Sequence, residues 1–421
     1  MAVATHSVTD LCRAARSAAR ELATLDSATK DRALLAVADA LEARTPEILE
    51  ANARDLEAGR ESRLSAALMD RLALDPGRTG AIARGVREIV ALPDPVGEVI
   101  GGSRLANGLQ MRKVRVPLGV VAVVYEARPN VTIDAAALCL KSGNAILLRG
   151  SSSAAHSNAV LAGVAREAAE ANGLPAGALS LIAGGGREEL AELAGQEGLV
   201  DLIIPRGGEG LKQALAAVAK VPVIYAASGN CHVFVDASAD LEDARAIILN
   251  AKTQRPGVCN AAETLLVHAG VAGAFLPVAL RALHEAGVEL RGDEHVRAVA
   301  DEVPVAEATD EDYAEEFLAP VLAVRVVDSA DDAIEHINAY GSGHSESIVT
   351  ASVDAARAFQ LGVDAACVYV NASTRFTDGG EFGMGAEIGN STQKLHARGP
   401  IGLRELCTFK YLVEGTGQVR P

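Results

Sequence analysis

The sequence predicts an α/β fold built on doubly wound parallel sheets. Beyond residue 93, short β-rich runs alternate with alanine-rich helical stretches, an alternation typical of parallel strands joined by helical crossovers. Before residue 92 the pattern is helical, and an Asn107-Gly108 pair between the two regions marks a hairpin. The 421 residues are enough for two to three domains with large buried cores.

Residues 7–91 form the expected series of amphipathic helices. Helix starts are expected at Ser27, Thr29 and Thr45-Pro46, and breaks at Gly59 and Pro76-Gly77. In the next segment, 102–117, strand-like arms flank the Asn107-Gly108 turn signal, so this segment is expected to fold into a hairpin.

The strands of the parallel sheets are expected at the β-rich runs, in two groups. The first group comprises 120–125, 145–149, 179–183, 200–205 and 221–225. The second comprises 233–236, 264–267, 321–327 and 368–371, with helices at 241–251 and 330–339. A last β-rich run, 407–413, is expected to pair with the 102–117 hairpin or with another subunit.

Charge and composition exclude several classes of protein. The 39 Lys and Arg against 55 Asp and Glu give a net charge of −16, which repels phosphate backbones and anionic lipids. Aromatic residues make up 3% of the chain, too few for base stacking or an interfacial belt. We therefore expect no nucleic-acid partner and no membrane association. Residues 1–20 lack the apolar run of a signal peptide, and the longest apolar stretch, 114–125, is too short for a spanning helix, so we expect neither.

The six cysteines lie far apart and lack the paired spacing of zinc or dithiol sites, so we expect no metal and a reducing cytoplasmic location. Cys259 differs from the others because it lies in a Pro/Gly-punctuated loop, with Arg255 nearby in sequence. Positive charge and exposed backbone N–H groups lower a thiol pKa and activate it as a nucleophile. The alternative is a small residue packed in a turn.

Three loops follow expected strands, where α/β sheets place their ligands. The first, 125–130, contains Glu126, Arg128 and Asn130; ordinary surface charge and helix capping are the structural alternatives. The others, 149–153 and 205–210, are loops of small residues that can present N–H donors to phosphate. Neither contains G-x-G-x-x-G, so tight turns remain the alternative for both.

Four segments follow one another in a characteristic order: 125–158 (YEARPNVTIDAAALCLKSGNAILLRGSSSAAHSN), 201–211 (DLIIPRGGEGL), 254–260 (QRPGVCN) and 327–348 (VDSADDAIEHINAYGSGHSESI). Together with 374–402 they resemble the glutamate-5-semialdehyde dehydrogenase family, also called gamma-glutamyl phosphate reductases, of the aldehyde dehydrogenase superfamily. The resemblance covers nearly the whole chain.

The resemblance implies an aldehyde dehydrogenase-like plan of three parts. A Rossmann-like cofactor domain would comprise 1–101 and 118–236, and an α/β catalytic domain 237–399. A small β-arm for oligomerisation would comprise 102–117 and 400–421. The family resemblance further implies a homodimer or homotetramer, with association with glutamate 5-kinase as an additional expectation.

The resemblance also implies roles for individual residues. Cys259 would be the nucleophile, and Asn130 would help to form the oxyanion hole. On the cofactor side, Glu316 would contact the nicotinamide ribose, and Gly207 and Gly208 would face the pyrophosphate. In the 149–153 loop, Ser151 is a further cofactor contact, and Arg149 occupies the position of a lysine near the adenosine ribose. A guanidinium suits a 2′-phosphate, which favours NADPH.

One departure from the superfamily bears on the reaction. Hydrolytic members carry a glutamate that activates water, whereas the matching segment 225–230 (YAASGN) has no carboxylate. This favours a phosphate-linked reaction, the NADPH-dependent reduction of L-glutamyl 5-phosphate in proline biosynthesis, over the alternative of a hydrolytic aldehyde dehydrogenase. A catalytically silent scaffold is the other alternative. The expected substrate contacts are Arg128, Arg255 and Arg375 for the anions and Glu126 for the ammonium.

Overall fold

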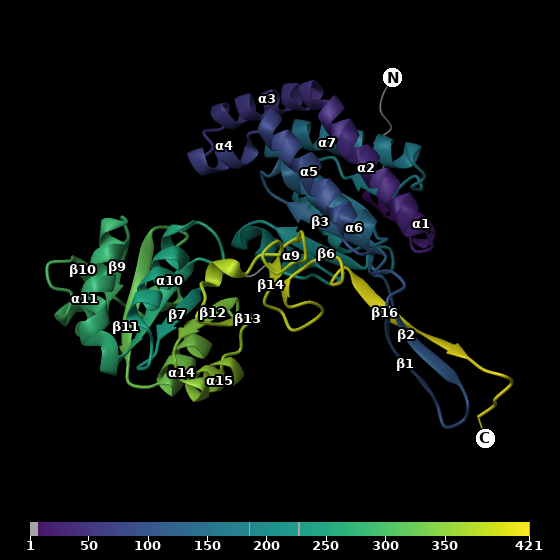
Figure 1. The fold of residues 1–421 in the computed structure, drawn as a ribbon. Coiled ribbons are helices and arrows are strands. Elements are labelled where there is room, and N and C mark those ends of the chain that lie inside the picture. The colour runs from purple at the N-terminus through teal and green to yellow at the C-terminus, as the bar shows by residue number, and fades with distance from the viewer. Residues whose placement is uncertain (1–6, 185, 226–227, 421) are drawn as a thin grey trace. The chain divides into compact units, whose positions relative to one another are not determined.

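The computed structural model describes residues 7–184, 186–225 and 228–420. The chain divides into two compact units (Figure 1). The first comprises Met1–Tyr225, Gly383–Gly389 and Ile401–Pro421, and the second comprises Ala226–Phe382 and Asn390–Pro400. Within the described ranges, no helix is both long and apolar enough to cross a membrane.

Five helices open the first unit, as the amphipathic pattern predicts: α1 (Val8–Leu22), α2 (Ser27–Ala43), α3 (Thr45–Glu61), α4 (Ala66–Leu72) and α5 (Pro76–Ala91). Asp26 caps α2 by accepting the Thr29 N–H at 2.7 Å. The break expected at Gly59 is wrong, because α3 runs on to Glu61. Gly59 instead allows close packing, since a Cβ there would lie 2.8 Å from the sulfur of Met69.

The first unit contains a four-stranded parallel sheet in the order β5-β4-β3-β6. Its elements are β3 (Val120–Tyr125), α6 (Pro129–Lys141), β4 (Ala145–Gly150), η1 (Ser152–Ala154), α7 (Ala155–Ala171), β5 (Leu179–Leu181), α8 (Arg187–Ala194), β6 (Leu202–Arg206) and α9 (Glu209–Val218). Every residue of β3 and β4 is buried, as expected for the centre of a parallel sheet.

The strand expected at 221–225 is wrong. Val223 forms only an isolated bridge with Ile203 of β6. Pro222 has no N–H to donate, so the ladder cannot extend along this segment.

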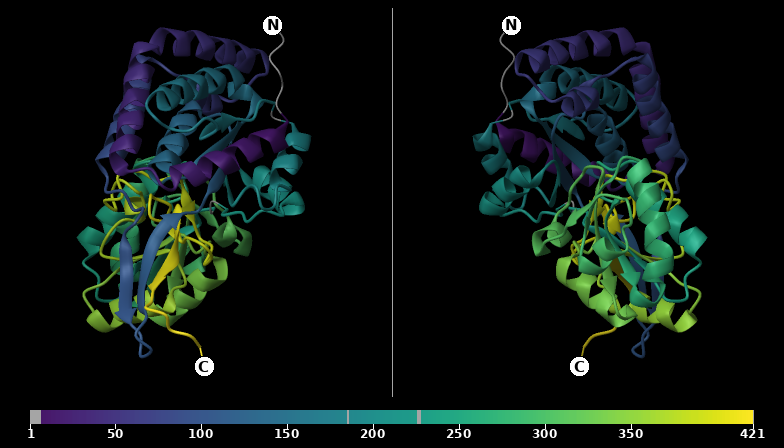
Figure 2. Two further views of the ribbon diagram at one scale, coloured as in Figure 1. Left: turned by 90° about the vertical axis from the view of Figure 1, so that its right-hand side faces the viewer. Right: turned by 90° about the vertical axis from the view of Figure 1, so that its left-hand side faces the viewer.

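A three-stranded antiparallel β-arm belongs to the first unit. It consists of β1 (Val99–Arg104), β2 (Gln110–Pro117) and β16 (Cys407–Glu414), in the order β1-β2-β16. Figure 2 shows the arm from two sides, with its strands side by side. Gly108 has φ +86° in the hairpin turn, and β16 pairs with β2 along its whole length. The predicted hairpin and its pairing with the terminal strand are confirmed.

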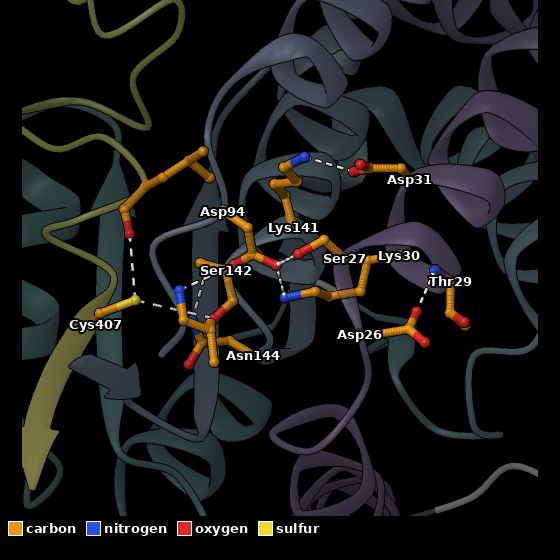
Figure 3. Close-up of polar contacts among 12 residues, drawn as sticks. Asp26, Ser27, Thr29, Lys30, Asp31, Asp94, Lys141, Ser142, Asn144 and Cys407 are labelled. Atoms are coloured by element: carbon orange, nitrogen blue, oxygen red, sulfur yellow. Dashed lines mark hydrogen bonds and ion pairs between the residues drawn. The ribbon is translucent and has the colours of Figure 1, made fainter. Parts of the chain in front are cut away.

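Buried polar contacts fix the root of this arm, around Lys30 (Figure 3). Lys30 is fully buried, and its Nζ lies 2.5 Å from Oδ2 of Asp94, which also accepts the Ser27 hydroxyl at 2.7 Å. Nearby, Asn144 donates to the carbonyl of Leu406, directly before β16, at 2.8 Å. Helix α2 and the turn between α6 and β4 are thereby tied to the two chain segments that enter the arm.

The second unit is built on a seven-stranded parallel sheet in the order β10-β9-β11-β8-β7-β12-β13. Its strands are β7 (Cys231–Val235), β8 (Ala262–His268), β9 (Glu289–Gly292), β10 (Val305–Glu307), β11 (Val321–Val327), β12 (Ser345–Val349) and β13 (Cys367–Val370). Its helices are α10 (Leu241–Thr253), α11 (Ala269–Glu285), α12 (Glu294–Ala298), α13 (Asp310–Ala314), α14 (Ala330–Tyr340), α15 (Val353–Gly362) and η2 (Thr374–Phe376), and β14 (Asn390–Ser391) pairs with β15 (Gly399–Pro400).

The predicted α/β class is confirmed, and the observed division differs from the expected boundaries in several respects. Gly383–Gly389, expected in the catalytic domain, belongs to the first unit, and Pro400, expected in the β-arm, belongs to the second. Strand β7 belongs to the second unit because it pairs with β8 and β12, so this unit begins at Ala226 rather than at 237. The β-arm groups with the first unit rather than apart from it.

Candidate active site

Cys259 lies in a short loop of the second unit, between the end of α10 and the start of β8. A turn closes this loop, in which the Ala261 N–H donates to the Val258 carbonyl at 3.0 Å. None of the six cysteines, all within the described ranges, forms a disulfide; Cys259 is partly exposed and the other five are buried. Cys259 is therefore the cysteine that solvent and a substrate can reach.

The backbone of Cys259 packs directly against the segment before β7. A Cβ added to Gly229 would lie 1.5 Å from the Cys259 carbonyl oxygen, so only glycine fits at this position. The same carbonyl oxygen accepts a hydrogen bond from the Cys231 thiol, with a sulfur–oxygen distance of 3.2 Å. Neither contact was expected, because nothing in the sequence indicates that residues about thirty positions apart meet here.

Asn260 anchors the loop from the other side. Its buried side chain donates to the carbonyls of Arg375 and Thr377, at 3.3 and 2.9 Å. Its own carbonyl accepts the Thr374 hydroxyl at 2.7 Å. The loop that contains Cys259 is thus held by a second stretch of chain, around η2, that contains Arg375.

Arg375 and Arg255 bring positive charge to the surroundings of Cys259. Burial lowers the pKa of Arg375, the charge of Arg255 lowers it further, and Cys259 acts in the opposite direction. Arg375 is half-buried, and its Nε donates to the side-chain oxygen of Gln254 at 2.8 Å. The structure therefore brings together two of the predicted anion contacts beside the predicted nucleophile.

Glu316 is connected to the same loop through Gly229. Its Oε1 accepts the Gly229 N–H at 2.7 Å, and burial raises the pKa of the half-buried carboxyl. Two residues further on, Leu318 has φ +50°, a strained value for a residue with a Cβ. The Leu318 N–H donates at 3.3 Å to Glu263, which forms a fully buried ion pair with Lys252.

Four further predicted residues of the first unit gather at the carboxyl ends of β3, β4 and β6. The Gly208 N–H donates to Oε2 of Glu126 at 3.1 Å, and the Ser151 hydroxyl accepts the Ala127 N–H at 3.2 Å. Glu126 therefore lies with the predicted cofactor contacts. Gly207 allows this approach, since a Cβ there would lie 2.7 Å from the Glu126 carboxyl carbon.

Residues at this edge of the sheet fit a dinucleotide cofactor. The space that a Cβ of Gly208 would enter is open, and its N–H, at the start of α9, already binds an anionic oxygen of the kind that a phosphate offers. The Arg149 guanidinium is largely buried and donates to the Gly186 carbonyl at 2.8 Å, while its Nε has no partner within the described ranges. Burial lowers the pKa of Arg149.

Asn130 and Arg128 stand at the start of α6. The helix begins at Pro129 with Arg128 as its N-cap, so the alternative of Asn130 as an ordinary cap is wrong. The Asn130 amide instead donates to Oδ2 of Asp134 at 2.9 Å. Burial raises the pKa of Asp134 to about 6, and the bond from Asn130 opposes that rise.

Part of the segment matched to the hydrolytic glutamate lies outside the described residues. Of 225–230, the structure describes Tyr225 and 228–230 but not Ala226 and Ala227. No cluster of three or more potential metal ligands occurs in the part of the chain that the structure describes.

Comparison with known proteins places the chain in a family. The model of the aldehyde dehydrogenase family matches residues 2–302 and 305–410. A gamma-glutamyl phosphate reductase of Thermobifida fusca is 59% identical, over 96% of this chain and 97% of its own length. The chain belongs to the gamma-glutamyl phosphate reductases of the aldehyde dehydrogenase family. The family resemblance deduced from the sequence is thereby confirmed.

Two further members support this placement. The gamma-glutamyl phosphate reductase of Moorella thermoacetica is 57% identical, over 96% of this chain and 97% of its own. The crystal structure of the Thermotoga maritima gamma-glutamyl phosphate reductase is 46% identical, with a TM-score of 0.96 over 99% of this chain and all of the other. The similarity to the Thermotoga maritima structure covers nearly the whole chain, the β-arm and the two sheets included.

Proposed function

We propose that this chain reduces L-glutamyl 5-phosphate to L-glutamate 5-semialdehyde and phosphate with NADPH, the second step of proline biosynthesis. The observation that carries the proposal is the partly exposed Cys259, whose loop is held by hydrogen bonds and lies beside two arginines. The relatives that match this chain over nearly its full length are gamma-glutamyl phosphate reductases.

The reaction starts at the sulfur of Cys259. Its thiolate attacks the acyl carbon of the substrate, the carbon–oxygen bond to phosphate breaks, and phosphate leaves with that electron pair to give a thioester. The Cys259 backbone N–H is the first oxyanion donor, and the family resemblance assigns the second to the Asn130 amide. When bound, NADPH supplies the hydride that brings the thioester carbon to the aldehyde level. Release of the aldehyde returns Cys259 as thiolate.

The absence of a carboxylate from 225–230 supports this reaction over hydrolysis. A hydrolytic aldehyde dehydrogenase must activate water to release its thioester. In the phosphate-linked reaction, phosphate is the leaving group in one direction and the nucleophile in the other. No water-activating base is then required.

Substrate and cofactor contacts follow the charges of the two molecules. Arg255 and Arg375 supply positive charge for the phosphate or carboxylate, with Arg128 as a third candidate, and Glu126 is the candidate for the ammonium. For the cofactor, Arg149 and Ser151 are assigned to the adenosine side and Glu316 to the nicotinamide ribose. Gly207 and Gly208 are assigned to the pyrophosphate.

The proposal includes assembly of the chain through its β-arm as a homodimer or homotetramer. Three apolar side chains of β16 are about half-exposed along one edge of the arm: Phe409, Tyr411 and Val413. Burial of such a surface against a second copy would stabilise an oligomer. We further propose a cytoplasmic location and association with glutamate 5-kinase, which would shorten the path of a labile acyl phosphate.

The test of the chemical step is Cys259→Ala. Turnover is expected to disappear, while NADPH binding, followed by fluorescence titration, stays at the wild-type level. Turnover retained by this variant would exclude the thioester mechanism.

A further inference from the structure

A second cysteine holds the main chain of the nucleophile. Cys231 is the first residue of β7 and is fully buried. Its sulfur lies 3.2 Å from the carbonyl oxygen of Cys259, while Gly229 packs against the same carbonyl. The peptide that follows the nucleophile is therefore confined by a steric contact and a hydrogen bond, both from the chain segment that enters β7.

The thiol of Cys231 keeps its proton. Burial, and next the charge of Glu346, raise the pKa of Cys231 well above its usual range. Burial also lowers the pKa of the neighbouring His344 to about 4, so this imidazole is neutral near pH 7. Since the Cys259 carbonyl can only accept, the hydrogen bond between the two cysteines runs from Cys231 to Cys259.

A chain of hydroxyls provides a partner for Nδ1 of His344 without the thiol proton. The Tyr369 hydroxyl lies 2.7 Å from Oγ1 of Thr377, which lies 2.6 Å from Oγ of Ser345, and Ser345 Oγ lies 2.7 Å from Nδ1 of His344. If each hydroxyl donates to the next, all three protons are used and Nδ1 is occupied as an acceptor. The sulfur of Cys231 is 3.9 Å from Nδ1, well beyond its distance to the Cys259 carbonyl.

We propose that Cys231 is a positioning residue for Cys259: its thiol fixes the carbonyl that follows the Cys259 Cα and, through that Cα, directs the Cys259 backbone N–H of the preceding peptide toward the developing oxyanion. The inference rests on the proposed function, in which that N–H stabilises a tetrahedral intermediate. Cys231 itself touches neither substrate nor cofactor. Its effect is therefore expected in acyl transfer and not in the intrinsic reactivity of the Cys259 sulfur.

Two reactions of Cys259 separate these effects. Acylation by 4-nitrophenyl acetate passes through an oxyanion and releases 4-nitrophenolate, whereas alkylation by iodoacetamide displaces iodide and forms no oxyanion. For Cys231→Val, which cannot donate, we expect acylation to slow about five- to tenfold, with alkylation within about twofold of the wild type. Cys231→Ser keeps an O–H donor and is expected to restore acylation to within about threefold.

The matched control is Cys139→Ala, which removes an equally buried thiol from α6, a helix of the first unit. If Cys231→Val fails to fold, Cys231→Ala replaces it in the comparison with Cys231→Ser. Acylation at the wild-type rate in the variant without a donor overturns the proposal. So does equal slowing of acylation and alkylation, or equal slowing in the valine (or alanine) and serine variants.

The outcome for Cys231 is independent of the outcome for the proposed function. The nitrophenyl ester requires neither a nicotinamide cofactor nor L-glutamyl 5-phosphate, so the acylation ratios stand even if the natural substrate proves to be different. The proposed function is tested separately, by phosphate-dependent turnover of the wild-type chain.

Discussion

Replacement of Gly229 by alanine is expected to displace Cys259, the proposed nucleophile. The new Cβ would lie 1.5 Å from the carbonyl oxygen of Cys259 and 2.5 Å from its Cα. Because ordinary contacts are above 3 Å, one of the two backbones must move by roughly 1.5 Å, and misplacement of about 1 Å at a reacting centre can cost about 100-fold in rate. We expect kcat to fall by about that factor, equivalent to ~2.7 kcal/mol of transition-state stabilisation.

The assay is the steady-state reverse reaction, with glutamate 5-semialdehyde, NADP⁺ and phosphate, alongside thermal unfolding. Gly273→Ala is the matched control, since Gly273 lies on the exposed side of α11 and a Cβ there meets nothing within 4 Å. The control should retain activity and gain about 0.5–1 kcal/mol of stability. Wild-type kcat in Gly229→Ala would refute the reasoning that the Gly229 contact sets the position of Cys259.

Three further predictions concern stability and cofactor choice. Lys30→Met breaks a buried ion pair and should lower the free energy of unfolding by about 3–5 kcal/mol in urea melts. Arg54→Ala, in an exposed pair with Glu50, should change it by less than about 1 kcal/mol. Similar losses in the two variants would contradict the burial argument. Burial lowers the pKa of His344 to about 4 from 6.5, so between these pH values only the unfolded chain takes up this proton. The contribution of His344 to the free energy of unfolding is therefore fully present above pH 6.5 and falls by about 1.4 kcal/mol per pH unit between pH 6.5 and 4. His344→Asn should flatten that slope, and an unchanged slope would exclude His344 as its source. Arg149→Met should reduce the preference for NADPH over NADH at least about tenfold in titrations, while Arg166→Met, on the exposed side of α7, should not; an unchanged preference would remove Arg149 from the 2′-phosphate site.

The parts of the fold that the sequence could predict are those in which local pattern and tertiary packing agree. Strands β3 and β11 are runs of β-branched and aliphatic residues, and their bounds match the predicted ranges. Strand β12 was not expected because its sequence, Ser-Glu-Ser-Ile-Val, is polar. Its Glu346 is nevertheless fully buried. The Glu346 Oε2 accepts the backbone N–H of His232, a partner more than one hundred residues away, and lies 3.0 Å from Nδ1 of the same residue.

The candidate site likewise contains residues that the local sequence predicts and contacts that it does not. Cys259 and Arg255 could be predicted because one short Pro/Gly-containing loop holds both the thiol and the nearby positive charge. The contacts of Gly229 and Cys231 with the Cys259 carbonyl, and of Glu316 with Gly229, depend on strand order and on packing between segments distant in sequence. Periodicity carries no information about such contacts, so only the three-dimensional structure brings them out.

The most direct test of the proposed reaction is the phosphate dependence of aldehyde oxidation by the purified wild-type chain. Glutamate 5-semialdehyde is incubated with NADP⁺ or NAD⁺, with and without inorganic phosphate, and formation of the reduced cofactor is followed. The account predicts strict dependence on phosphate and faster turnover with NADP⁺. Turnover without phosphate would contradict it and assign the chain to the hydrolytic aldehyde dehydrogenases.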